Sequence, residues 1–248
     1  MAIVINGSGT ITGVSVGGLP DGSVDSDTLA TGIDATKLAD GTITNSELQY
    51  INSLSSNAQT QITAADGAGG WELITGTAAS TSAHVEFVSS FTGYNCICFV
   101  ISNYIQATNA AALYMITSTD GGSTYPSVNS TYDWCKTQNS IGGSEQIVDN
   151  SGSTGTHIPL CRTVYGSVLE HSSAGGSVFV IYMSGHNSAT TGTYFNWTSA
   201  WNDHGGQLTS TVGAGRTNAS ADVDGVRFIA ESGNITSGSF NCYGLVSS

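Results

Sequence analysis

The alternation of apolar and polar residues from position 70 onward predicts a series of short β-strands. Between them lie clusters rich in Gly, Ser and Asn, which are typical of tight turns. The segments expected to form strands are 71–77, 84–89, 94–104, 111–118, 158–169, 177–184, 193–201, 223–230 and 239–246. We therefore expect a mainly β protein, in which residues 70–248 form an antiparallel, jelly-roll-like β-sandwich.

Residues 44–67 have a different spacing, of three and four residues, which predicts a helix. Thr44 and Glu47 form a capping-box pattern, in which each side chain satisfies the backbone amide of the other residue. Apolar and small residues then recur along a narrow stripe that is typical of a coiled-coil seam. The residues of this stripe that we expect to mediate oligomerisation are Leu48, Ile51, Ala58, Ile62 and Ala65.

A single helix with so narrow a stripe is marginal in water, because an isolated short helix barely outweighs its nucleation cost. It needs a partner, which is either its own head domain or the identical helices of other copies. The slender polar region that precedes it favours the second arrangement. We therefore expect a short trimeric coiled coil.

Residues 1–20 alternate around the turn-forming residues 6–9, which predicts a hairpin. A lone two-stranded hairpin is marginal in water, so this segment is expected to dock onto a larger particle. The residues expected to make that attachment are Ile3, Ile5, Ile11 and Val14.

Residues 21–43 carry a short repeat, in which a β-branched residue is followed five residues later by a leucine, as in Ile33 and Leu38. So few apolar side chains cannot be buried within one chain, but several copies wound about an axis could enclose them. The repeat therefore predicts an extended shaft. The alternative is a flexible linker.

The charge of the chain restricts its partners. Five Lys and Arg against eighteen Asp and Glu give a formal net charge of −13, which repels nucleic acid. No apolar run reaches the roughly 18 residues that a membrane span needs, and the first residues lack the pattern of a signal peptide. We expect no nucleic-acid partner and no membrane insertion.

The five cysteines are an odd number, so they cannot all pair within one chain. We expect buried free thiols, assembled in a reducing cytoplasm, with Cys96 and Cys98 on one face of a strand and pointing into the core. The five cysteines are Cys96, Cys98, Cys135, Cys161 and Cys242.

The chain shows no catalytic or zinc-binding spacing, and its acids lie mostly in turn-like contexts. We therefore expect no enzymatic activity and no cofactor. Asp222 and Asp224 present hard oxygens beside Gly225, but the rest of an EF-hand loop is missing.

The aromatic residues suggest a second kind of site. Rings that stack on sugars often lie beside Asn, Asp and His, so one interpretation is a glycan-binding platform in the head. The alternative is that the same rings fill the sandwich or an interface between subunits. The residues concerned are Tyr132, Trp134, Trp197 and Trp201.

Two parts of the chain resemble a known class of proteins. Residues 25–43, with the unit Thr-Gly-Ile-Asp-Ala-Thr-Lys-Leu, and residues 47–62 resemble the shaft and neck of tail-fibre and head-fibre proteins of marine and cyanobacterial phages. Residues 118–125 and 232–245 resemble a module found in phage fibres and virion surface proteins. In such proteins the neck segment trimerises.

The resemblance implies a structural fibre or surface-decoration protein of a bacteriophage virion, assembled in the host cytoplasm. It would be a homotrimer, bound through its N-terminus to capsid or tail proteins, and it would expose its head. The alternative is a receptor-binding adhesin that recognises a host surface glycan. A polysaccharide-degrading tailspike is disfavoured. Such an enzyme needs two carboxylates about 5 to 10 Å apart across a sugar, whereas the acids of this chain lie mostly in turn-like contexts.

Overall fold

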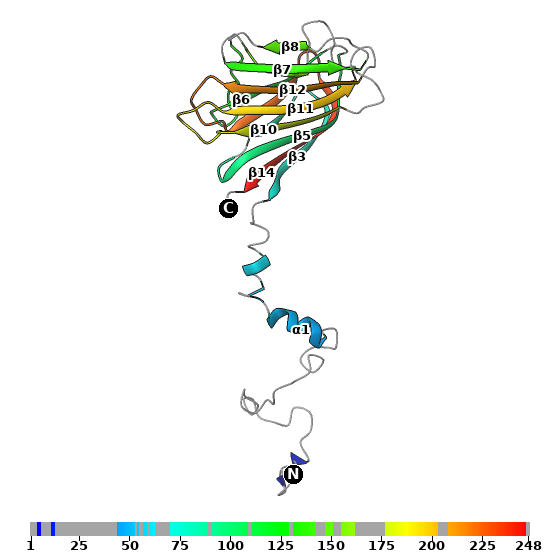
Figure 1. The fold of residues 1–248 in the computed structure, drawn as a ribbon, viewed down its shortest axis with the longest axis vertical. Coiled ribbons are helices and arrows are strands. Elements are labelled where there is room, and N and C mark those ends of the chain that lie inside the picture. The colour runs from blue at the N-terminus through cyan, green and yellow to red at the C-terminus, as the bar shows by residue number, and fades with distance from the viewer. Residues whose placement is uncertain are drawn as a thin grey trace. The chain divides into compact units, whose positions relative to one another are not determined.

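The computed structural model describes the chain in fourteen stretches, grouped in two compact units, Met1–Ala65 and Asp66–Ser248 (Figure 1). The described residues are 4–5, 11–12, 44–52, 54, 57–58, 60–62, 70–88, 91–108, 111–128, 131–141, 147–150, 155–161, 177–202 and 208–246.

In the first unit, strands β1 (Val4–Ile5) and β2 (Ile11–Thr12) pair antiparallel, with Ile5 opposite Ile11. This pairing agrees with the hairpin pattern of the sequence. The other two residues expected to attach the protein to a particle, Ile3 and Val14, lie outside the described residues, as does the repeat of residues 21–43.

Helix α1 (Asn45–Asn52) begins at the predicted capping box. The Glu47 carboxylate accepts a hydrogen bond from the Thr44 amide at 2.8 Å, and the Thr44 hydroxyl oxygen accepts one from the Glu47 amide at 3.3 Å. The Thr44 amide and the Thr44 hydroxyl both donate to the Glu47 carboxylate and hold the pKa of Glu47 below its ordinary value, so its negative charge is retained at the positive end of the helix. The predicted start of the helix is confirmed.

The predicted single helix over residues 44–67 is interrupted. Leu54 and Asn57 are not helical, and a new helical turn begins after Asn57, whose side-chain oxygen accepts from the Thr60 amide at 2.7 Å. An Asn side chain that accepts a hydrogen bond from a nearby backbone amide competes with the hydrogen bonds of the helix. Asn is therefore more favourable at the start of a helix than in its interior. Ala58 and Ile62 are exposed, whereas Ala65 and the side chains of Leu48 and Ile51 lie outside the described set.

The second unit, the head, is mainly β with antiparallel sheets, as the sequence predicts. Its described strands are β3 (Trp71–Ser82), β4 (His84–Val88), β5 (Tyr94–Gln106), β6 (Leu113–Ser118), β7 (Tyr132–Ser140), β8 (Ile147–Asn150), β9 (Ile158–Cys161), β10 (Val178–Ser184), β11 (Tyr194–Asn202), β12 (Leu208–Thr217), β13 (Gly225–Ala230) and β14 (Ile235–Val246).

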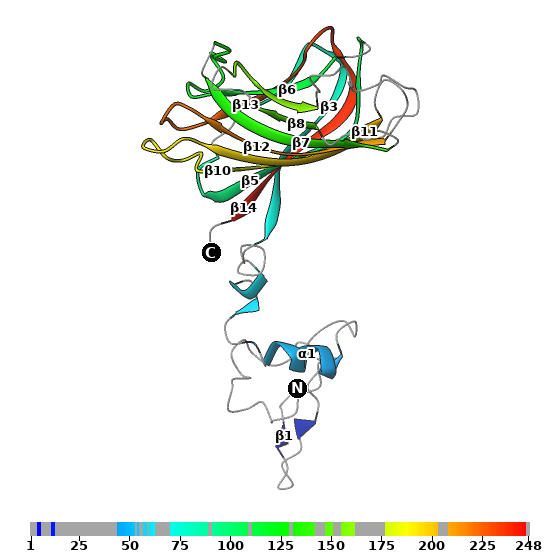
Figure 2. The same ribbon diagram turned by 45° about the horizontal axis from the view of Figure 1, so that its top comes forward.

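These strands form a large sheet, in the order β3-β14-β5-β10-β11-β12-β7-β8, and a small sheet, in the order β4-β13-β6-β9. Figure 2 shows them as two layers, with β6 and β13 above β12, β11 and β10 of the large sheet. A jelly roll has eight strands in two Greek keys, whereas the described part of the head has sheets of eight and four strands. The two-layer expectation therefore agrees with the structure, and the jelly-roll strand count does not.

Each of the nine predicted strand segments overlaps an observed strand, but β7, β8 and β12 were not predicted. In β12 the buried positions are occupied by Thr and Gly, and in β7 they include Lys136 and Gln138. A strand whose inward residues are polar or lack a side chain shows no apolar alternation in its sequence. These inward residues are buried because the neighbouring strands cover them.

Aromatic rings join the two sheets. Phe99 of the large sheet and Phe228 of the small sheet pack edge to face, with ring centroids 5.5 Å apart. Phe87 lies within 5.6 Å of Phe99 and 6.2 Å of Phe228, so the three rings form one buried cluster. Edge-to-face pairs add about 0.5–1.5 kcal/mol each beyond the burial of their area.

A glycine makes room for Trp197, one of the two fully buried tryptophans. Trp197 of β11 lies directly opposite Gly213 of β12, and it is fully buried. A Cβ atom at position 213 would overlap the indole ring of Trp197. The absence of a side chain in β12 therefore lets the indole lie across the neighbouring strand.

We predict that Gly213→Ala destabilises the head by about 1–3 kcal/mol, because the added methyl group overpacks against a buried ring. Chemical denaturation of the two proteins measures the difference. Gly70→Ala is the matched control, since no atom lies within 4 Å of a Cβ there. Equal stability of Gly213→Ala and the unmodified protein would contradict this packing.

Candidate functional site

The large sheet has one face that the small sheet does not cover. In β10, β11 and β12 buried and exposed residues alternate, so every second side chain points away from the core. We call these outward positions of β7, β10, β11 and β12 the outer face. Its large apolar residues, between 41% and 56% exposed, are Val178, Tyr182, Tyr194, Leu208 and Val212.

The outer face carries little charge, although the whole chain is strongly acidic. Among the described outward residues of these four strands, the charged ones are Asp133 of β7 and Arg216 of β12. They are direct cross-strand neighbours and form an ion pair with an N–O distance of 2.8 Å. The face is therefore close to neutral on a chain with a formal net charge of −13.

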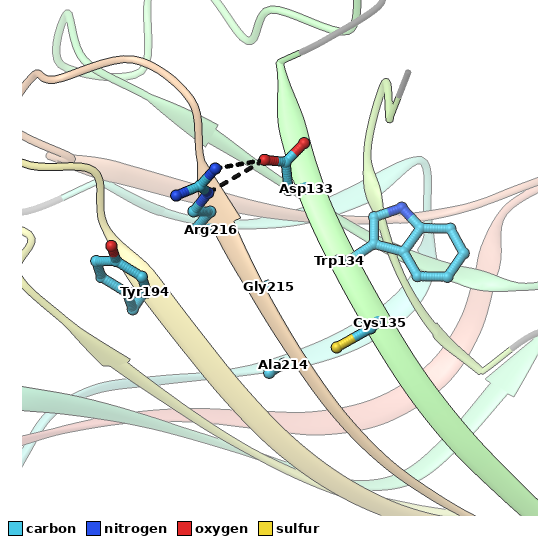
Figure 3. Close-up of a pocket in the computed structure, with 7 residues that line it drawn as sticks. All are labelled: Asp133, Trp134, Cys135, Tyr194, Ala214, Gly215 and Arg216. Carbon is cyan, nitrogen blue, oxygen red and sulfur yellow. Dashed lines mark hydrogen bonds and ion pairs between the residues drawn. The ribbon is translucent and has the colours of Figure 1, made fainter. Parts of the chain in front are cut away.

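A hollow of about 360 Å³ lies at the ion-pair end of the outer face (Figure 3). Tyr194, Arg216 and Asp133 lie side by side on β11, β12 and β7. Ala214 and Cys135 form the next cross-strand pair, and their short side chains leave the space open. Figure 3 shows the ring of Trp134 on the opposite side of β7 from the sulfur of Cys135.

The Asp133 carboxylate is held by three donors. Arg216 donates from Nε and Nη2 to Oδ2, at 3.1 and 2.8 Å, and Asn218 donates to Oδ1 at 3.1 Å. These hydrogen bonds lower the pKa of Asp133, and the hydrogen bonds from Arg216 have a larger effect than the one from Asn218. Asp133 in turn raises the pKa of Arg216. Since both side chains are partly exposed, the pair contributes little to global stability and acts mainly by neutralising charge.

The four aromatic residues considered for glycan binding are not brought together as a platform. Tyr132, Trp197 and Trp201 are fully buried, and the Tyr132 hydroxyl accepts a hydrogen bond from the Thr117 amide at 2.8 Å. They occupy inward strand positions, where a sugar cannot reach them, so they fill the core. Trp134 is half-buried and borders the hollow, but its ring lies on the other side of β7 and packs against the core.

All five cysteines are free. Cys98, Cys161 and Cys242 are buried, Cys96 is half-buried and Cys135 is exposed. Cys96 and Cys98 share one face of β5, as predicted, but it is the face turned away from the core, which Ile97 and Phe99 enter instead. Cys98 is shielded by its cross-strand neighbours Tyr182 and Tyr243 rather than by the core.

The acidic segment at Asp222 and Asp224 lines a second hollow, of about 340 Å³. One oxygen of Asp224 accepts a hydrogen bond from the Gly121 amide at 2.9 Å, so this side chain holds the neighbouring turn. Within the described stretches, no three His, Cys, Asp or Glu side chains are grouped closely enough to hold a metal ion. The helices described are too short to be candidates for a membrane span.

Sequence reasoning missed the residues that define the outer face. Val212 and Arg216 belong to β12, which the sequence pattern does not predict as a strand, and Asp133 is one of the acids that the sequence pattern does not single out. These residues lie on one face because of the register between β11, β12 and β7, and no local pattern in the sequence reveals that register.

In comparisons with models of protein families, with curated proteins and with solved structures, nothing matches this chain. Its function therefore has to be argued from its own residues.

We predict that Arg216→Gln raises the pKa of Asp133 toward its ordinary value, because the largest cause of the lowered pKa is removed. A carboxyl titration followed by NMR measures it. The pair stabilises the folded state slightly at neutral pH. This stabilisation is lost as the pH falls below about 4 and through the lowered pKa of Asp133, because the carboxylate is then protonated.

Asn218→Ala removes the weaker donor and is the matched control, expected to raise the pKa by less. An unchanged Asp133 pKa in Arg216→Gln would contradict the ion pair.

Proposed function

We propose that this protein is a non-enzymatic structural protein of a bacteriophage particle, a fibre or surface-decoration protein that acts as a homotrimer. The observation that carries the proposal is the outer face of the head. Five large apolar side chains, each 41–56% exposed, lie on this one nearly uncharged face, as is typical of an interaction site. The resemblance of residues 25–43 and 47–62 to the shafts and necks of phage fibres suggests that the partners are virion proteins and other copies of this chain.

In this proposal, separate segments of the N-terminal region provide attachment, the shaft and trimerisation. Residues 1–20 bind capsid or tail proteins through Ile3, Ile5, Ile11 and Val14, and residues 21–43 form the shaft. Residues 44–67 join three copies through Leu48, Ile51, Ala58, Ile62 and Ala65. The 56% exposure of Ile62 in a single copy supports this assignment, because it leaves a large apolar side chain available to partners. The protein is then a component of the virion, assembled in the host cytoplasm.

A receptor-binding adhesin is the second candidate, and one observation favours it. Tyr194 is 52% exposed and lines a hollow that also contains the Asp133–Arg216 pair. An aromatic ring beside hydrogen-bonding groups is the arrangement that sugar recognition needs. In this version the hollow, rather than a platform of four rings, would take the glycan.

We predict that replacing Ile51 and Ile62 together by Asp abolishes or strongly weakens trimerisation of the full chain. Six carboxylates would lie near one axis, where burial without a partner is costly. Mass measurement in solution gives the oligomeric state, and the thermal transition of the head is expected to remain.

Ser46→Asp combined with Gln49→Asp is the matched control, since it adds the same charge at two exposed positions of α1 outside the stripe. A double Ile variant that remains a trimer of unchanged stability would place the association elsewhere, and a monomeric unmodified chain would refute the proposed trimer.

The two candidate functions differ in their response to Tyr194→Ala. If the protein is purely structural, the unmodified chain and this variant are expected to bind host cells and envelope polysaccharide equally weakly. A clear loss of binding in Tyr194→Ala, with the thermal transition retained, would instead favour the adhesin. Tyr194→Phe is the control, because it keeps an aromatic face.

A further inference from the structure

We propose that the outer face of the large sheet is covered by a second copy of this chain, so that the heads of an assembly pack against one another through it. The inference rests on the homo-oligomer of the proposed function and adds the surface through which the heads meet.

The first argument is electrostatic. Two copies with a formal net charge of −13 repel each other wherever their acidic surfaces approach. On the described outer face the charges of Asp133 and Arg216 neutralise one another. Contact through this face therefore carries a smaller electrostatic cost than contact through an acidic surface.

The second argument is the chemistry of the face. Val180, Thr198, Val212 and Thr137 form one uncharged, β-branched row across β10, β11, β12 and β7. Such side chains have few rotamers to lose when they are covered. A stiff and neutral surface of this kind suits packing against another sheet.

The third argument is size. Four strands spaced by about 4.8 Å and about 30 Å long present a face of roughly 600 Å². The large sheet continues beyond β10 into β5, β14 and β3, where Trp71 packs on Tyr182 with ring centroids 5.9 Å apart. A standard stable interface buries about 800 Å² per partner, so the outer face provides about three quarters of that area and the neighbouring strands provide the rest.

The face contains a natural reporter. Cys135 is exposed on the outer face, whereas Cys98, Cys161 and Cys242 are buried and Cys96 is half-buried. If a second copy covers the face, Cys135 becomes inaccessible to a thiol reagent. Its rate of modification therefore measures whether the face is open.

The experiment is maleimide labelling of the full chain, with the modified cysteine identified by mass spectrometry and the oligomeric state measured in parallel. We expect Cys135 to react at least tenfold more slowly than in Val212→Asp, which places a carboxylate on the face. Val212 is 56% exposed in the single chain, so this variant is expected to retain the thermal transition of the head.

Val128→Asp is the matched control, because Val128 is 68% exposed in a loop outside the outer face. It makes the same substitution and adds the same charge, and we expect Cys135 to stay protected. Val212→Thr keeps a neutral β-branched side chain and is expected to behave like the unmodified chain.

The inference is overturned if the full chain is a trimer whose Cys135 reacts equally fast in the unmodified protein and in Val212→Asp. In that case the proposed trimer stands and the heads do not meet through this face. A monomeric chain with a fast-reacting Cys135 refutes both. Protection that appears only when envelope polysaccharide is added would assign the face to a glycan and also overturn the inference.

Discussion

The packing of the small sheet on one face of the large sheet is the contact on which the rest of the head depends. It is made by aromatic rings, with Phe99 against Phe228 at its centre. A four-stranded layer covers the inner face of an eight-stranded sheet and leaves the outer face without a cover in the single chain. The same contact therefore creates both the core and the surface that is available for association.

This packing also decides which polar residues are buried. Lys136, Gln138 and Thr211 lie on inward positions of β7 and β12. Buried polar groups have to be hydrogen-bonded, and Ser199 donates to the Leu160 carbonyl while Thr211 donates to Gln138. These partners come from strands far apart in the sequence, so the polar interior is stable only once the sheets are assembled.

The electrostatics of the head connect the fold with its proposed role. An acidic chain that keeps one of its broad surfaces neutral has a place where copies can approach at low cost. The Asp133–Arg216 pair adds little to stability, and its effect is to remove net charge from this face. A structural protein of a particle needs surfaces of this kind more than it needs a reactive cleft.

The sequence by itself determined the mainly β class, the approximate position of nine strands and the start of α1, because alternation and the capping box at Thr44 and Glu47 are local patterns. Only the tertiary structure decided that β12 is a strand and that Trp197 is core rather than ligand site. Gly213 and the inward threonines carry no apolar signal, and their burial depends on neighbours brought together by strand register. The outer face, including Val212, exists for the same reason, since it is defined by which side of the large sheet the small sheet covers.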